Sequence, residues 1–110
     1  MPMASKSLIA TFAAVSCAFL AVGCTAGGSR PMAGSIEHCV QRAKLAMRDS
    51  DFTERFAVYP GLEETVVYGQ HGGYRAHLHC IVDNPTIGVE VTGFDPAQTQ
   101  RYKESIIKRL

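Results

Sequence analysis

The segment from Tyr74 to Val82, YRAHLHCIV, constrains the fold more than any other stretch, because its residues follow the period-2 pattern of a half-buried β-strand. Alternate side chains of a strand point to opposite faces of its sheet. The face that we expect to be buried consists of Tyr74, Ala76, Leu78, Cys80 and Val82. The opposite face consists of Arg75, His77, His79 and Ile81. One face therefore carries a cysteine, and the other carries a His-x-His pair.

Helical and strand-like patterns flank this segment. Apolar residues recur at helical spacing after Ser35, a residue type that favours helix N-caps, and turn-forming residues follow at 49–51. Residues 63–69 and 87–93 predict two further strands, joined to the first by turns. Asp95, Pro96 and Gln98 form a capping-box pattern that predicts a second helix toward the end of the chain. Residues 52–62 fit a packed loop, a short helix or an edge strand.

Together these elements predict an α+β fold with two layers in the order α-β-β-β-α. Its three strands form an antiparallel meander, and its two helices cover one face of the sheet. At 110 residues without tryptophan, the chain has room for one small, mostly aliphatic core after an export leader. A domain of this size often needs a covalent cross-link for stability.

The first 24 residues have the three parts of a bacterial export signal. Lys6 lies in a short positive region, residues 8–22 form a charge-free apolar run, and small residues precede Cys24. The run is too short to span a bilayer comfortably as a permanent helix. The closing sequence Ala21-Val22-Gly23-Cys24 resembles the lipobox of bacterial lipoproteins, although that family usually has Leu where this chain has Ala21.

The resemblance implies that residues 1–23 are a signal peptide and that Cys24 is acylated and becomes the new N-terminus. Because Thr25 rather than Asp follows, the family pattern implies an outer-membrane lipoprotein that faces the periplasm. The alternatives are ordinary cleavage after Gly23 or Ala26, which leaves a soluble periplasmic protein, and a retained anchor. Residues 24–35 are rich in Gly and Ser and predict a flexible tether, so the folded domain is expected at 36–110.

The cysteines of the mature chain predict a disulfide. Cys17 would leave with the leader, and Cys24 would carry lipid, so Cys39 and Cys80 remain as an even pair in an exported protein. Cys39 lies on the apolar stripe of the first helix, and Cys80 lies on the buried face of the strand. The alternative, a redox-active pair, is disfavoured because the spacing is unlike Cys-x-x-Cys and both positions look buried.

The His-x-His pair supports two interpretations. His77 and His79 could chelate one metal if a third ligand joined them. If Val82 pairs with Ile87, Glu90 lies opposite His79 and could supply that ligand. Glu64 could approach from the other side, depending on the register of the first hairpin. The simpler interpretation is a solvated face on which His79 and Glu90 form a cross-strand pair, so that no metal or other cofactor is expected.

The same strand face also predicts a partner surface, because apolar and aromatic residues accompany the histidines. Its members are Val66, Tyr68, Arg75, His77, His79 and Ile81. The surface would be lost if residues 52–62 folded back over it. Eleven basic and ten acidic residues, without a basic stretch interleaved with aromatics, argue against a nucleic-acid partner.

No catalytic motif accompanies these features. We therefore expect a non-enzymatic cell-envelope lipoprotein, held to the membrane by its N-terminal lipid, that acts as an interaction or accessory module. It would bind an envelope protein or a copy of itself. The alternative is a metal-binding protein or small metal-dependent hydrolase that uses His77 and His79.

Overall fold

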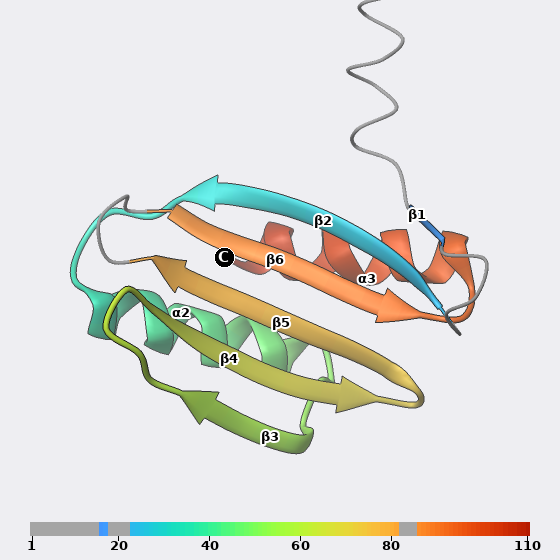
Figure 1. Cartoon of the computed structure of the whole chain (residues 1–110), viewed down its shortest axis with the longest axis horizontal. Helices are drawn as coiled ribbons and strands as arrows, with labels where there is room; N and C mark the ends of the chain where they lie inside the picture. The colour runs from blue at the N-terminus through green and yellow to red at the C-terminus, as the bar shows by residue number, and fades with distance from the viewer. Residues whose placement is uncertain (1–15, 18–22, 82–85) are drawn as a thin grey trace, which may run out of the picture.

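The computed structural model describes residues 16–17, 23–81 and 86–110. Its elements follow in the order β1 (Ser16–Cys17), β2 (Cys24–Pro31), α2 (Ile36–Asp49), β3 (Glu54–Tyr59), β4 (Glu64–His71), β5 (Tyr74–Ile81), β6 (Thr86–Gly93) and α3 (Pro96–Arg109). The strands form an antiparallel sheet in the order β1-β2-β6-β5-β4-β3. Both helices lie against one face of this sheet, behind the strands in Figure 1.

The α+β class is confirmed, but the sheet is larger than the predicted three-stranded meander. The meander β4-β5-β6 is present, and β2 and β3 extend it on its two sides. The prediction of a flexible tether at 24–35 is wrong for its first eight residues, because β2 pairs with β6 along its whole length, from Cys24 opposite Gly93 to Pro31 opposite Thr86. The folded domain therefore includes Cys24.

Small residues let β2 lie close beneath α3. Ala26 is fully buried, and a Cβ on Gly28 would lie only 2.8 Å from Ile107 Cδ1 on α3. The Gly-rich composition that resembles a linker thus also fits a strand under a closely packed helix.

Residues 52–62, which the sequence leaves open, supply the edge strand β3. Phe52 is fully buried on the helix side, and β3 pairs with β4 from Tyr59 opposite Val66 to Glu54 opposite Gln70. The register shifts between Glu54 and Ala57, where Arg55 has a φ of +50°. This irregularity explains why the segment lacks a clean period. Because the segment extends the sheet sideways, it leaves the outer face of β4 and β5 uncovered.

Both predicted helix starts are present. The Ser35 side chain accepts a hydrogen bond from the His38 N–H at 3.2 Å, and Asp95 accepts one from the Gln98 N–H at 3.0 Å. The apolar stripe of α2 (Cys39, Ala43, Ala46 and Met47) is buried against the sheet. The predicted disulfide between Cys39 and Cys80 ties this stripe to β5.

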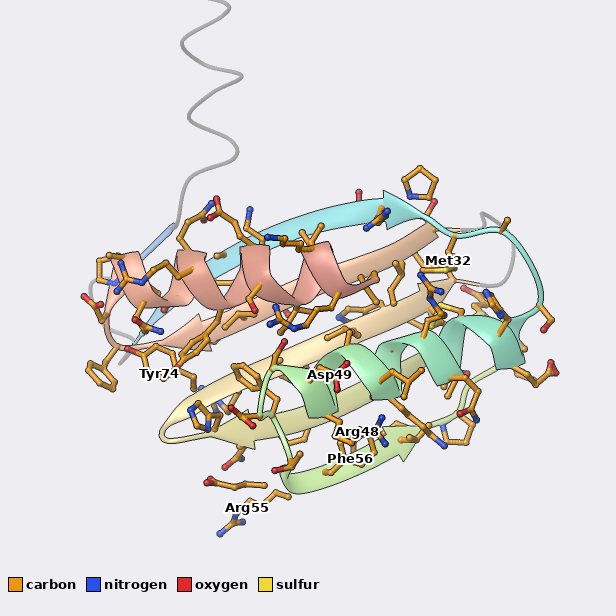
Figure 2. The ribbon with its side chains drawn as sticks, turned by 180° about the vertical axis from the view of Figure 1, so that it is seen from behind. Met32, Arg48, Asp49, Arg55, Phe56 and Tyr74 are labelled. Carbon is orange, nitrogen blue, oxygen red and sulfur yellow. A yellow bond between two sulfur atoms is a disulfide. The ribbon has the colours of Figure 1, made fainter. Side chains whose placement is uncertain are left out.

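An aromatic cluster lies on the helix side of the sheet, at the end where β2 begins. Its members are Phe52, His71, Tyr74, Phe94 and Tyr102. The Tyr74 ring lies between those of Phe94 and Tyr102, with centroids 5.1 and 5.0 Å away. Gly93 lies directly beneath Tyr74, where a Cβ would overlap the ring. Figure 2 shows Tyr74 on the helix side of the sheet.

Candidate functional site on the open face of the sheet

The face of the sheet that carries no helix is here called the open face, and Figure 1 views the molecule from this side. Buried and partly exposed residues alternate along β4 and β5. This alternation places the even-numbered residues of β4 and the odd-numbered residues of β5 on the open face. All six residues predicted as a partner surface occupy such positions: Val66, Tyr68, Arg75, His77, His79 and Ile81.

The strand register brings four of these residues into one cluster. Val66 lies opposite His79, and Tyr68 lies opposite His77. The Tyr68 and His77 rings are 4.8 Å apart at a tilt of 56°. The Gln70 side-chain amide donates a hydrogen bond to the Tyr68 hydroxyl, which holds the phenol on the surface. Aromatic and apolar side chains therefore meet across two neighbouring strands.

One member of the cluster is missed by sequence reasoning. Tyr59 on β3 lines a shallow depression of about 390 Å³ together with Val66, Tyr68 and His77. Its side chain is 58 % exposed. The bulge in β3 hides the strand pattern, so the only sequence signal for Tyr59 is an aromatic residue directly before the Pro60-Gly61 turn.

His77 is held in its neutral form by its surroundings. Its ring is partly buried, and within the described part of the chain its Nδ1 atom has no hydrogen-bond partner. Burial lowers the pKa of His77, and His79 and Arg75 lower it further, whereas Glu90 opposite raises it. The net direction is downward, so at neutral pH the open face presents an uncharged, partly apolar ring here.

The predicted pairing of His79 with Glu90 is wrong. Cys80 rather than Val82 lies opposite Ile87, which shifts the register by two residues and places Glu90 opposite His77. His79 instead contacts Glu64 on β4, with 3.2 Å between Nδ1 and Oε1. Residues 82–85, where the sequence predicts the turn between these strands, lie outside the described residues.

The two histidines do not converge with an acid on a common point. Their rings are stacked, with centroids 6.3 Å apart and planes inclined by 22°. Across the described residues, no three His, Cys, Asp or Glu side chains come together as metal ligands. The two imidazole rings thus lie side by side on the open face.

The predicted lipidation site lies at the far corner of the sheet. Cys24 is the first residue of β2, and its sulfur is bonded to Cys17, which the sequence assigns to the departing leader. A thioether to lipid and this disulfide need the same sulfur atom, so the two states exclude each other. The rest of the predicted signal peptide, residues 1–15 and 18–22, lies outside the described residues.

Within the described ranges, no helix is both long and apolar enough to cross a membrane. No family model, curated protein or solved structure matches this chain. Its function is therefore argued from its own residues.

Proposed function

We propose that this chain is a non-enzymatic lipoprotein of the bacterial cell envelope whose open face binds a protein partner. The observation that carries the proposal is the cluster of Tyr59, Val66, Tyr68 and His77 on a sheet face that the helices leave uncovered. Aromatic residues are enriched at the centres of protein interfaces, because they supply large contact areas at a small cost in side-chain entropy.

The arrangement around the cluster supports a protein rather than a small ligand. The depression is shallow, and charged groups lie at its borders: Arg75 on one side and the Glu64–His79 pair on the other. An apolar centre with a polar rim is the usual anatomy of a protein interface.

Two features support the envelope as the location. The disulfide between Cys39 and Cys80 is of a kind that persists in oxidising compartments. The leader resembles those of lipoproteins up to Cys24. Under this proposal, acylation captures the Cys24 thiol before it pairs with Cys17, and cleavage then removes Cys17 with the leader.

The position of Cys24 gives the proposed anchor a structural consequence. Because Cys24 already pairs with Gly93, no tether separates the lipid from the sheet. Phe94, which follows Gly93 in the sequence, is 68 % exposed and would face the headgroup region.

The chain contains no tryptophan, so Phe94→Trp provides a single fluorophore at this end of the sheet. Its emission should shift to the blue when the acylated protein enters vesicles, whereas Leu62→Trp at the opposite end should not respond.

Metabolic labelling with palmitate tests the anchor itself. Label should appear in the wild-type chain and disappear in Cys24→Ala. The matched variant Cys17→Ala removes the competing disulfide and should keep full labelling. Equal labelling of both variants would show that Cys24 is not the acceptor.

Site-specific photocrosslinking tests the partner surface. A benzophenone amino acid at Tyr68 should give one discrete product in the native envelope, and His77→Ala should reduce its yield. The same amino acid at Ser29, which is exposed on β2, is the matched control and should give none. A product of twice the chain mass would identify self-association, and equal products from both positions would refute a specific surface.

A further inference from the structure

Exposed apolar side chains gather on one side of the domain. Among the described residues, the exposed large hydrophobics are Leu45, Phe56, Tyr59, Leu62, Ile81 and Phe94. Four of these six belong to β3, to the turn that follows it, or to the part of α2 that faces it. Exposed apolar residues that were scattered singly over the surface would not gather around one edge strand in this way.

A groove runs between α2 and β3 on the helix side of the sheet, apart from the open face. It has a volume of about 400 Å³ and is lined by Gln41, Lys44, Leu45, Arg48, Thr53 and Phe56. Figure 2 shows Arg48 from α2 and Phe56 from β3 on the two sides of this groove. Leu45 and Phe56 provide apolar walls and are 44 % and 40 % exposed.

The groove is cationic. Its lining contains Lys44 and Arg48 and no acidic residue. Among the described residues, Arg48 lies within ion-pair distance of one acid, Asp49, at 3.8 Å between Nε and Oδ1, and both side chains are more than half exposed. Exposed pairs of this kind are weak, so the guanidinium group stays available to an incoming carboxylate.

The strand that borders the groove has a free edge. β3 is the last strand in the sheet order, and no other strand of the described chain pairs with its outer side. Such an edge presents unpaired N–H and C=O groups, which can accept a further strand. A strand added there would lie along the groove, with alternate side chains directed at α2.

We propose that the groove between α2 and β3 binds an extended acidic segment of a partner protein, which adds to β3 as a further strand. Its apolar side chains would contact Leu45 and Phe56, and its carboxylates would pair with Lys44 and Arg48. A second copy fits less well, because its β3 carries one anion, Glu54, and one cation, Arg55, and so brings no net negative charge to a cationic groove. This site does not depend on the open face or on the lipid anchor.

Fluorescence anisotropy with designed peptides tests this inference. The probe is a fluorescein-labelled decapeptide of alternating Glu and Val, and the comparison peptide alternates Lys and Val. We expect the acidic peptide to bind at least about tenfold more tightly, because its carboxylates match the two cations. Equal affinity of the two peptides, or no binding of the acidic one, would overturn the inference.

Charge reversal locates the bound peptide. Lys44→Glu/Arg48→Glu should weaken binding about tenfold or more. The control Lys108→Glu/Arg109→Glu makes the same change in net charge at the C-terminal end of α3, outside the lining of the groove, and should alter affinity less than about twofold. Circular dichroism checks that both variants are folded. If the control pair weakened binding as strongly, the attraction would be non-specific and the groove would not be the site.

Two further measurements distinguish strand addition in the groove from binding to the open face. Two versions of the acidic peptide are compared, one N-methylated at its odd positions and the other at its even positions. One of the two should lose binding, because strand addition needs the N–H groups of alternate residues. Tyr68→Ala should leave peptide binding unchanged. Loss of binding in Tyr68→Ala would place the peptide on the open face, and unchanged binding of both methylated peptides would exclude strand addition.

Discussion

Removal of the Cys39–Cys80 disulfide should cost this domain a large part of its stability. The bond joins α2 to the central strand β5 across 41 residues, and both half-cystines are buried. A cross-link stabilises chiefly by restricting the unfolded chain, and for a loop of this length the chain-entropy model gives about 4 kcal/mol. Domains of this size have total stabilities of roughly 5 to 15 kcal/mol, so the loss would be severe.

The second disulfide provides an internal comparison. Cys17 and Cys24 close a loop with a separation of only 7 residues, for which the same model gives about 2.4 kcal/mol. Cys39→Ala/Cys80→Ala should therefore lower the free energy of unfolding by about 1.6 kcal/mol more than Cys17→Ala/Cys24→Ala. Alanine is the appropriate replacement in both pairs, because it leaves no unsatisfied polar atom in the core.

Urea unfolding of the full chain, followed by far-ultraviolet circular dichroism, measures both losses. The m-value of Cys39→Ala/Cys80→Ala should rise, because its unfolded chain expands further. Wild-type protein with its disulfides reduced should be at least as unstable as this variant. A loss below about 1 kcal/mol, or a larger loss in the Cys17/Cys24 variant, would refute the argument from loop length.

Two other predictions concern the open face and the aromatic cluster. Because the folded pKa of His77 lies below its ordinary value of 6.5, the unfolded chain binds the proton first as pH falls. Stability should therefore decrease below pH 6.5 toward the folded pKa, and urea titrations of His77→Gln should show a smaller decrease. Gly93→Ala should cost about 1–3 kcal/mol, because its Cβ overlaps the Tyr74 ring. The control Gly27→Ala, where the nearest atom to a Cβ is 3.8 Å away, should be nearly neutral in the same titration.

The parts of the fold that sequence reasoning found are those set by local chemistry. The caps at Ser35 and Asp95 and the alternation of residues 74–81 each depend on a few adjacent residues. The disulfide followed from combining two such local patterns, the stripe of a helix and the face of a strand. Its confirmation depends on both elements being oriented as predicted.

The parts that sequence reasoning missed are set by distant contacts. β2 has no apolar period, and its strand character comes from pairing with β6 and from the close approach of α3. Glu90 lies opposite His77 and not His79 because the register of β5 against β6 is shifted by two residues, and Glu64 reaches His79 from the other side through the register of β4 against β5. Tyr59 joined the site only because β3, despite its bulge, lies beside β4.

The sheet itself contains the strongest comparison in favour of a partner surface. Both halves of the open face are free of helices, but they differ in composition. The half formed by β2 and β6 presents mainly small and polar residues, namely Thr25, Gly27, Ser29, Pro31, Thr86, Gly88, Glu90 and Thr92.

The hydroxyl groups of Thr25 and Thr92 form a hydrogen bond across the strands, with 3.2 Å between their oxygens, as on an ordinary solvated sheet. The half formed by β3, β4 and β5 presents Tyr59, Val66, Tyr68 and His77 instead. If solvent alone determined the open face, the two halves should be alike. The aromatic residues of this face lie in the half that borders the free edge of β3, and the cationic groove lies on the opposite side of that same edge. The partner binding that we propose for this half of the domain would account for both features.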